Sequence, residues 1–395
     1  MQWASAISSE PNANAAATEL KRDISRQLGR NSADLVLAFL TPHYEEAYDR
    51  IPALIADHLS PKAFIGCTAA GVIGNGREIE QRPGFALVAA VLPEVEIHPF
   101  HLEAGDLPDQ DVGPERWVQS LGVQPEPTPH FIMLVDAGGA PGFDPRPLVR
   151  GLDYAYSPRA AKIGGLASVL QGNCLFLGEE VHHSGCVGVA LQGNIVVDTV
   201  VAQGCRPVGG LLTVTGCSGY YLTGLDDRPA VEVLVELYHS LPADDQQLLQ
   251  SALHLGIAAT EFKQELGLGD FLIRDVMQLD HEKGFIAVGD LLRPGQTVQF
   301  HVRDAAAATQ DLELMLRRYC QSPTPTLPAG GLLFTCTGRG QHLFQEPDHD
   351  SVRFADAVGD IPLGGFFCGG EIGQVGDSTY IHGYTSSFGI FRPAH

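Results

Sequence analysis

The stretch FIGCTAAGVIGNG, residues 64–76, opens with two apolar residues and then places four glycines among small side chains. A buried strand rarely consists of residues that bury so little apolar surface. Glycine is favoured where pieces of backbone approach closely or adopt a positive φ. We therefore predict a short strand at 63–65 that runs into a tight turn where backbones pack together.

The glycine frame of this stretch recurs twice along the chain. One copy lies 299 residues later, where Gly66, Gly71 and Gly74 return as Gly365, Gly370 and Gly373. Another lies 98 residues later, where Gly66 and Gly74 return as Gly164 and Gly172. Agreement across three separated segments predicts a duplicated α-β unit, and a repeat of about 100 residues is a whole subdomain rather than a solenoid module.

Each copy contains the same order of expected elements: a buried strand, a helix, the glycine-rich turn and two closing strands. The first strands are expected at 34–40, 131–135 and 332–336, and the helices at 43–58, from Asp144 onward, and at 349–358. The predicted fold class is α+β, with duplicated α-β units forming two related domains of sheet and helix. The expected divisions are an N-terminal helix or tail at 1–30, an N-terminal domain at 31–215 with copies at 31–102 and 128–202, and a C-terminal domain at 216–395.

A different pattern separates the second copy from the third. Helices are expected at 228–241, 244–255 and 303–320, where apolar residues recur at helical spacing. Strands separated by turns are expected at 271–276, 284–288 and 297–302.

The charge of the chain limits its partners. With 25 basic and 47 acidic residues the net charge is −22, which repels nucleic-acid phosphates and anionic lipid. The start of the sequence lacks the pattern of a targeting signal, and no apolar run is long enough to span a bilayer. The eight cysteines are scattered without a CxxC pair, as in a reduced cytosolic protein. We therefore expect a cytoplasmic protein without a nucleic-acid partner or an integral membrane segment.

Several spaced motifs resemble the FIST family, named for F-box and intracellular signal transduction proteins. The N-terminal half contains IGCTAAGVIG, SGCVGVAL and GCRPVGGLLTVTGCSGYYLTGLDDRPAVEVL, and the C-terminal half contains LLFTCTGRG, GGFFCGGEIG and IHGYTSS. The chain departs from the family at Val72, where an acidic residue is common. No F-box-like helical segment precedes the domain, so the resemblance implies a stand-alone form without ubiquitin-ligase function.

The resemblance also implies a function. FIST domains are proposed to be sensory modules that bind small ligands such as amino acids and pass a signal to an attached or separate partner. It implies no catalytic mechanism that could be carried over to this sequence, so the candidate residues are considered on their own chemistry.

The richest group of candidate ligand-binding residues lies in the third copy. Arg339 follows a predicted strand, and Glu371 follows a glycine pair. If the strand ends of the copies meet, Arg339 would bind a ligand carboxylate in a bidentate manner and Glu371 an ammonium group, which suits an amino-acid-like ligand. The alternative is an internal Arg339–Glu371 ion pair that stabilises the core. The other members of this group are Cys336, Tyr384, Thr385 and Ser386.

Further candidates lie at the repeated turns. In the opening stretch they are Cys67, Thr68 and Gly71, and in the third copy Phe367 and Cys368. The alternative for Cys67 is a small apolar side chain buried in a crowded turn.

The preferred function is a non-enzymatic sensory module that binds a small ligand between its two domains and regulates a protein partner, without a cofactor or metal. Enzymatic activity is left open, because a thiol at Cys336 or Cys368 acting on a small carboxylate or thioester is one alternative. Spacing supplies no orienting third group for such a thiol. The other alternative is a protein-binding adaptor without a ligand.

Overall fold

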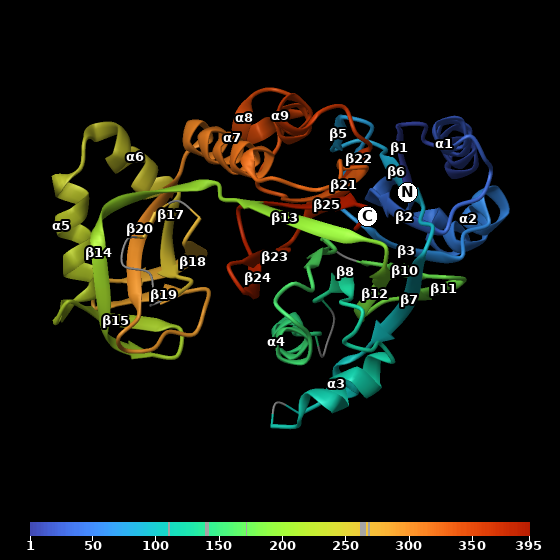
Figure 1. Cartoon of the computed structure of the whole chain (residues 1–395). Helices are drawn as coiled ribbons and strands as arrows, with labels where there is room; N and C mark the ends of the chain where they lie inside the picture. The colour runs from blue at the N-terminus through green and yellow to red at the C-terminus, as the bar shows by residue number, and fades with distance from the viewer. Residues whose placement is uncertain (110, 139–141, 171, 261–265, 268) are drawn as a thin grey trace. The chain divides into compact units, whose positions relative to one another are not determined.

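The computed structural model describes residues 1–109, 111–138, 142–170, 172–260, 266–267 and 269–395. The chain forms two compact units (Figure 1). The first contains residues 1–201, 313–381 and 385–395, and the second contains residues 202–312 and 382–384. In sequence, the second unit is therefore inserted into the first, between the second and third copies of the repeat.

The first unit contains all three copies of the repeat. The first copy comprises β2 (Leu35–Leu40), η1 (Pro42–Arg50), α2 (Ile51–Leu59), β3 (Ala63–Thr68), β4 (Gly71–Gly74), β5 (Arg77–Glu80) and β6 (Phe85–Val91). The second comprises β8 (His130–Asp136), α4 (Pro145–Ala155), β9 (Lys162–Leu166), β10 (Leu175–Leu177), β11 (Glu180–His182) and β12 (Gly185–Gly193). The third comprises β21 (Gly330–Cys336), α8 (Gln341–Phe344), α9 (His349–Val358), β22 (Leu363–Cys368), β23 (Glu371–Val375), β24 (Ser378–His382) and β25 (Ser386–Arg392). The α+β class and the three copies are confirmed.

Within each copy the first two strands are parallel and the last strand is antiparallel to the first. The hairpin between them pairs instead with another copy: β4–β5 with β22, β10–β11 with β3, and β23–β24 with β9. The opposite edges are completed by β1 (Gln2–Ser8), β7 (Val95–Leu102) and β13 (Val196–Ala202). The resulting six-stranded sheets have the orders β1-β6-β2-β3-β10-β11, β7-β12-β8-β9-β23-β24 and β13-β25-β21-β22-β4-β5. Because this exchange of hairpins is cyclic, no copy completes its sheet alone.

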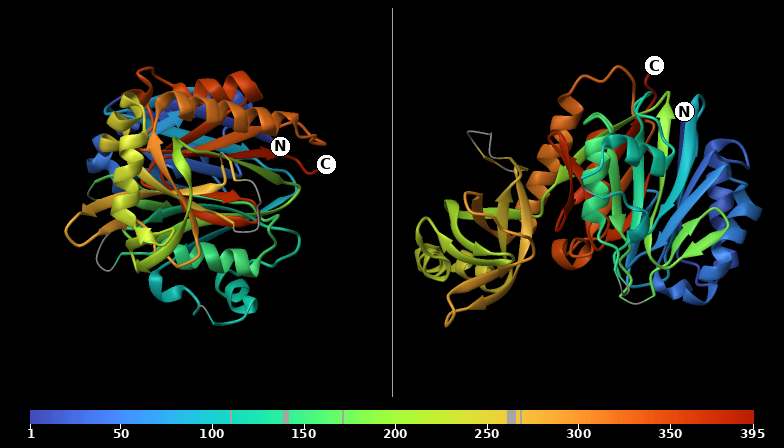
Figure 2. Two further views of the ribbon diagram at one scale, coloured as in Figure 1. Left: turned by 90° about the vertical axis from the view of Figure 1, so that its left-hand side faces the viewer. Right: turned by 90° about the horizontal axis from the view of Figure 1, so that it is seen from below.

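The two faces of each sheet pack against different elements. Along β2, Leu35, Leu37 and Phe39 point into a core that all three sheets share. The alternate residues pack under α1 (Ala13–Leu28) and α2, which lie together on the outer side of that sheet (Figure 2). Likewise α3 (Pro114–Leu121) and α4 cover the second sheet, and Phe354 of α9 stacks on Phe388 of the third. The uninterrupted apolar sequence of each first strand follows from this burial on both faces.

The recurring glycines lie where the second strand of each copy touches the first. Gly66, Gly164 and Gly365 occupy equivalent ladder positions, which confirms that part of the glycine frame. A Cβ at Gly365 would lie 1.8 Å from the carbonyl oxygen of Leu333, so no side chain fits there.

The predicted equivalence of Gly74 and Gly172 is wrong. The ladders place Leu177, opposite Ile65, in the position that Gly74 occupies opposite Gly364. The reason is a longer connection between β9 and β10, over 167–174, than the two-residue turn that joins β3 to β4.

The second unit is a closed antiparallel barrel. Around it β14 (Cys205–Ser218), β20 (Thr297–Arg303), β17 (Leu253–Ala258), β18 (Phe271–Asp280), β19 (Phe285–Val288) and β15 (Tyr221–Leu225) pair in that order, and β15 returns to β14. β16 (Arg228–Pro229) extends β15, while α5 (Ala230–Ser240) and α6 (Ala243–Ser251) share the barrel's apolar core. From the barrel, α7 (Ala305–Gln321) leads back to the first unit. No helix in the described ranges is long and apolar enough to cross a membrane.

The helix expected over 244–255 ends earlier than predicted. The structure ends α6 at Ser251 and begins β17 at Leu253, so His254 lies on a strand. Residues 253–258 form a strand because they pair with β18 on one side and with β20 on the other. The helical spacing of apolar residues in the sequence does not reveal this pairing.

Candidate functional site

A buried ion pair lies beyond the end of β21, in the predicted C-terminal group. Nε and Nη2 of Arg339 donate to the two carboxylate oxygens of Asp350 on α9, each at 2.8 Å. The two side chains are 0% and 2% exposed. Burial opposes the charge of both, but their mutual attraction outweighs it, raising the pKa of Arg339 and holding the pKa of Asp350 well below its ordinary value. The partner of Arg339 in the structure is thus Asp350, a residue that the sequence analysis did not select.

Other polar side chains surround this pair, and we call the group the strand-end cluster: Thr335, Cys336, Arg339, His349, Asp350, Glu371, Thr385 and Ser386. Asp350 also accepts hydrogen bonds from Thr335 (2.9 Å), His349 (2.8 Å) and Ser386. Glu371 accepts from the backbone N–H (3.2 Å) and the hydroxyl (2.7 Å) of Thr385. The structure therefore brings five of the predicted residues together in this cluster: the buried Arg339, Glu371, Thr385 and Ser386, and the half-buried Cys336.

The cysteines at the strand ends differ in exposure. Cys336 is half-buried, and its sulfur accepts from the N–H of Gly338 at 3.4 Å. Cys67 and Cys368 are fully buried, and burial raises the pKa of both thiols well above the ordinary value. Two thiols held in the neutral form have little nucleophilic character at neutral pH.

The remaining predicted residues of the repeated turns are packed against neighbouring copies. A Cβ on Gly71 would lie 2.8 Å from the ring of Phe367, so these two are in close contact. The hydroxyl of Thr68 accepts from the N–H of Cys174 at 3.0 Å. Ser168, which the sequence analysis did not select, joins the three copies: its hydroxyl accepts from the N–H of Ala70 at 2.8 Å and donates to the carbonyl of Phe367.

Tyr384 belongs to the second unit. Its φ of 67° is unusual for a bulky residue, and such backbone strain is often found at functional sites. Its hydroxyl donates to the carboxylate of Asp275, and the ring of His254 meets it edge-on at 4.2 Å between centroids. On the barrel, Arg303 lies with its guanidinium carbon 4.9 Å from the centre of the same ring.

Tyr384, Asp275 and His254 form one end of a pocket of about 710 Å³ in the barrel unit, and Arg303 lies outside its described lining. The pocket lies among α5, α6 and strands β17 and β18. Its described lining combines eight apolar residues, which include Leu234, Val235, Leu249, Val276, Met277 and Leu279, with nine polar ones, which include His239, Gln250, Gln278 and His281. Met277 and Leu279 are 60% and 40% exposed, which is uncommon for large apolar side chains. A cavity that combines apolar side chains with polar groups able to orient a ligand is the usual form of a small-molecule site.

The polar end presents hydrogen-bond acceptors. Nδ1 of His254 lies 2.9 Å from the carbonyl oxygen of Ala252, so this nitrogen carries the proton, and burial lowers the pKa of the ring. Nε2 is therefore an acceptor, and it lies 3.9 Å from Oδ1 of Asp275. Among the described residues that line the pocket, Tyr384 is the one that was predicted from the sequence. The others were not predicted, because they lie far from Tyr384 in the chain and only the fold brings them together.

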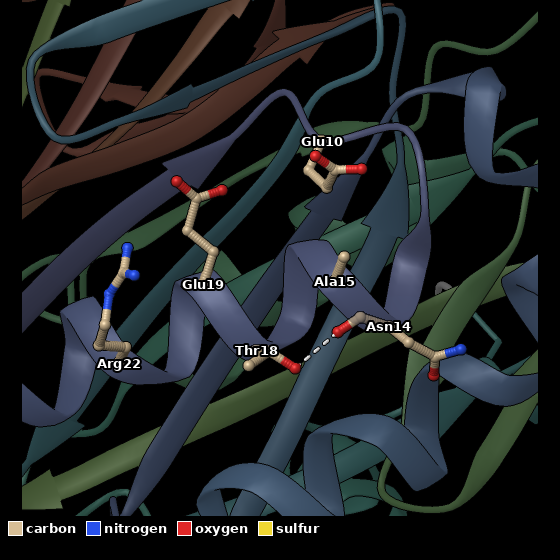
Figure 3. Close-up of a pocket in the computed structure, with 6 residues that line it drawn as sticks. All are labelled: Glu10, Asn14, Ala15, Thr18, Glu19 and Arg22. Atoms are coloured by element: carbon tan, nitrogen blue, oxygen red, sulfur yellow. Dashed lines mark hydrogen bonds between the residues drawn. The ribbon is translucent and has the colours of Figure 1, made fainter.

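A second hollow, of about 550 Å³, lies along α1 and is lined by Glu10, Asn14, Ala15, Thr18, Glu19 and Arg22. Figure 3 shows these side chains on the surface of one helix and the loop before it, with Thr18 bonded back to Asn14 at 2.8 Å. The lining is mainly polar and provides no apolar enclosure, so the barrel pocket is the better candidate. Within the described ranges, no three His, Cys, Asp or Glu side chains are grouped so as to hold a metal ion.

Comparison with known proteins agrees with the repeated architecture. The FIST N domain matches residues 34–228, and the FIST C domain matches residues 230–374. An uncharacterized protein of Mycobacterium tuberculosis is 37% identical over 391 residues, covering 98% of both chains. An uncharacterized protein of Mycobacterium bovis is 33% identical over 389 residues, covering 98% of this chain and 97% of that one.

Two further likenesses are weaker. An F-box/LRR-repeat protein of Arabidopsis thaliana is 31% identical over 96 residues, or 24% of this chain and 18% of that one. A crystal structure of a cyanuric acid hydrolase from A. caulinodans covers 99% of both chains at 8% identity, but its TM-score of 0.34 is too low to support an argument. The two family matches together span most of the sequence, and the chain belongs to the FIST family, whose domains are associated with signal transduction.

Proposed function

We propose that this chain is a cytoplasmic sensory module that takes up a small ligand in the barrel pocket and regulates a partner protein. The observation that carries the proposal is the pocket itself, which has a volume of about 710 Å³, apolar side chains in its walls and one end formed by His254, Asp275 and Tyr384. Such a shape binds a small molecule through its apolar body and orients it through few polar groups.

The chain segment at Tyr384 supports a route for the signal. Tyr384 bonds Asp275 at the pocket, Thr385 bonds Glu371, and Ser386 bonds Asp350 of the strand-end cluster. The first of these three consecutive residues belongs to the second unit and the other two to the first. A ligand that favours one position of Tyr384 would therefore shift the donors of two buried carboxylates, and such a difference in affinity between two states is what a signal requires.

This proposal gives the strand-end cluster a role in transmitting the change. Direct ligand contact stays a prediction for the residues selected from the sequence, which are Cys336, Arg339, Glu371, Thr385 and Ser386 in the cluster, Cys67, Thr68 and Gly71 in the opening turn, and Phe367 and Cys368.

A thermal-shift screen of a metabolite library tests the proposal. Met277→Glu places a charge on the apolar wall, and Leu291→Glu does the same at a 53% exposed leucine of the same unit outside the described pocket lining. We expect compounds that raise the melting temperature of the wild type and of Leu291→Glu but not of Met277→Glu. If no compound distinguishes the two variants, the pocket is not the ligand site.

The transmission step has its own readout. Hydrogen exchange of the amides of 385–386 should slow or quicken when such a compound binds, and a partner should co-purify differently with and without it. Unchanged exchange at these amides would contradict the route through Tyr384.

A further inference from the structure

We infer that the ligand of the barrel pocket is an amphipathic amine: a protonated nitrogen attached to an apolar body. This inference rests on the proposed function, because it names the ligand class of the same pocket.

The first argument is the charge at the polar end. Among the described residues that line the pocket, Asp275 is the one carboxylate; His239 and His281 are further basic side chains of the lining, and Arg303, outside it, lies over the ring of Tyr384. Its side chain is 60% exposed, so it faces an incoming ligand while accepting from Tyr384. At the Asp275 side of the pocket a ligand carboxylate or phosphate would be repelled by this charge, whereas an ammonium group would be paired with it.

The second argument is hydrogen-bond geometry. Because Nδ1 of His254 donates to Ala252, its Nε2 offers a lone pair 3.9 Å from the Asp275 oxygen. One nitrogen atom placed between these two acceptors lies within hydrogen-bond distance of both, and an ammonium group has three donors to direct at them. A hydroxyl has a single donor and satisfies one acceptor at a time. The site therefore favours an amine over an alcohol of the same shape.

The third argument concerns the body of the ligand. Beyond the polar end the walls include Leu234, Leu249, Val276 and the exposed Met277 and Leu279. An apolar ligand removes these surfaces from water, and the flexible methionine adapts to its outline. The net charge of −22 also raises the local concentration of cations around the protein.

Calorimetric titration with hexylamine, hexanol and hexanoate at neutral pH tests the inference, since the three probes share one apolar chain. The test variant is Asp275→Asn, which keeps an oxygen that can accept from Tyr384 but removes the charge. The matched control is Asp227→Asn, which removes an exposed charge from the same unit at a positive φ of 59° that asparagine tolerates. Circular dichroism confirms that both variants fold.

For the wild type and Asp227→Asn we expect hexylamine to bind at least about tenfold more tightly than hexanol, and hexanoate to bind most weakly. Asp275→Asn should reduce the preference for the amine to about twofold or less. Equal binding of amine and alcohol, or a preference that Asp275→Asn leaves unchanged, overturns the amine class. If hexanol then still binds in a manner that Met277→Glu abolishes, the proposed ligand pocket stands. If none of the three probes binds the wild type, the inference is wrong, and the library screen decides the proposed function separately.

Discussion

Asp350 accepts hydrogen bonds from both Nε and Nη2 of Arg339 at 2.8 Å, and the pair is almost completely removed from solvent. This single contact ties the turn after β21 to the start of α9, which are joined in sequence only through a short irregular segment and α8. It also occupies two of the guanidinium nitrogens that a ligand carboxylate would use, where the sequence left open either such a ligand or an internal ion pair.

Arg339→Met should therefore destabilise the protein strongly. The substitution leaves Asp350 as a buried charge without its main partner, which typically costs about 3–5 kcal/mol. Urea denaturation followed by circular dichroism measures this. Arg353→Met is the control, because Arg353 pairs with a half-exposed Glu346 and should cost about 1 kcal/mol or less. An unchanged urea midpoint for Arg339→Met would return Arg339 to the role of a ligand contact.

Glu78 should make stability decrease as pH rises. It is buried and accepts from the N–H and hydroxyl of Ser351 at 2.9 and 2.8 Å, while burial, with the nearby Asp350, raises its pKa to about 8. The folded protein then keeps a proton that the unfolded chain loses above its ordinary pKa of 4.5. The contribution of Glu78 is full below pH 4.5 and is lost as pH rises toward 8.

Glu78→Gln tests this directly, since the amide keeps the shape and cannot ionise. The free energy of unfolding of the variant, minus that of the wild type, should increase between pH 5 and pH 8. Two parallel pH profiles would show that Glu78 is ionised at the same pH in the folded and unfolded states.

Gly365→Ala should disturb the third sheet, because the added Cβ would lie 1.8 Å from the carbonyl oxygen of Leu333. Crowding of this kind costs about 1–3 kcal/mol or more when backbone must move. The melting temperature of the variant should fall clearly below that of Gly105→Ala, in the same unit, where a Cβ meets no atom within 4 Å. Equal melting temperatures would mean that β21 and β22 can move apart at this position without a loss of stability.

Tyr384→Phe should weaken the ligand response more than the fold. Loss of one hydrogen bond to Asp275 costs about 0.5–1.5 kcal/mol, while the ring and its contact with His254 remain. We expect a smaller ligand-induced rise in melting temperature than in Tyr220→Phe, the control at a 41% exposed tyrosine of the same unit. A ligand-induced rise equal to that of the wild type would show that the Tyr384 hydroxyl takes no part in ligand recognition.

The strand-end cluster shows how far sequence reasoning reaches at the site. Glu371 was predicted because it follows a recurring turn, and Thr385 and Ser386 because they lie at the end of a predicted strand; the structure buries all three in one polar cluster. Asp350 was missed because nothing in its local spacing sets it apart from an acidic residue in the first turn of an exposed helix. Asp350 becomes the buried partner of Arg339 only because the folded chain places the two side chains side by side.

The sequence by itself determined the local elements and their repetition. Runs of branched apolar residues mark the buried strands, helical spacing marks the covering helices, and Gly365 records a contact too close for any side chain. The strands and helices depend on neighbours along the chain, and the glycine is required by a close backbone contact at that one position.

The tertiary structure alone decided which hairpin pairs with which sheet, that the third copy joins the first two around a shared core, and that the inserted segment closes into a barrel with a pocket. Backbone hydrogen bonds between strands are the same for every sequence, so their partners are selected by packing over the whole chain. His254, Asp275 and Tyr384 are separated by 21 and 109 residues in the chain, and the folding of the barrel brings them to one end of the pocket.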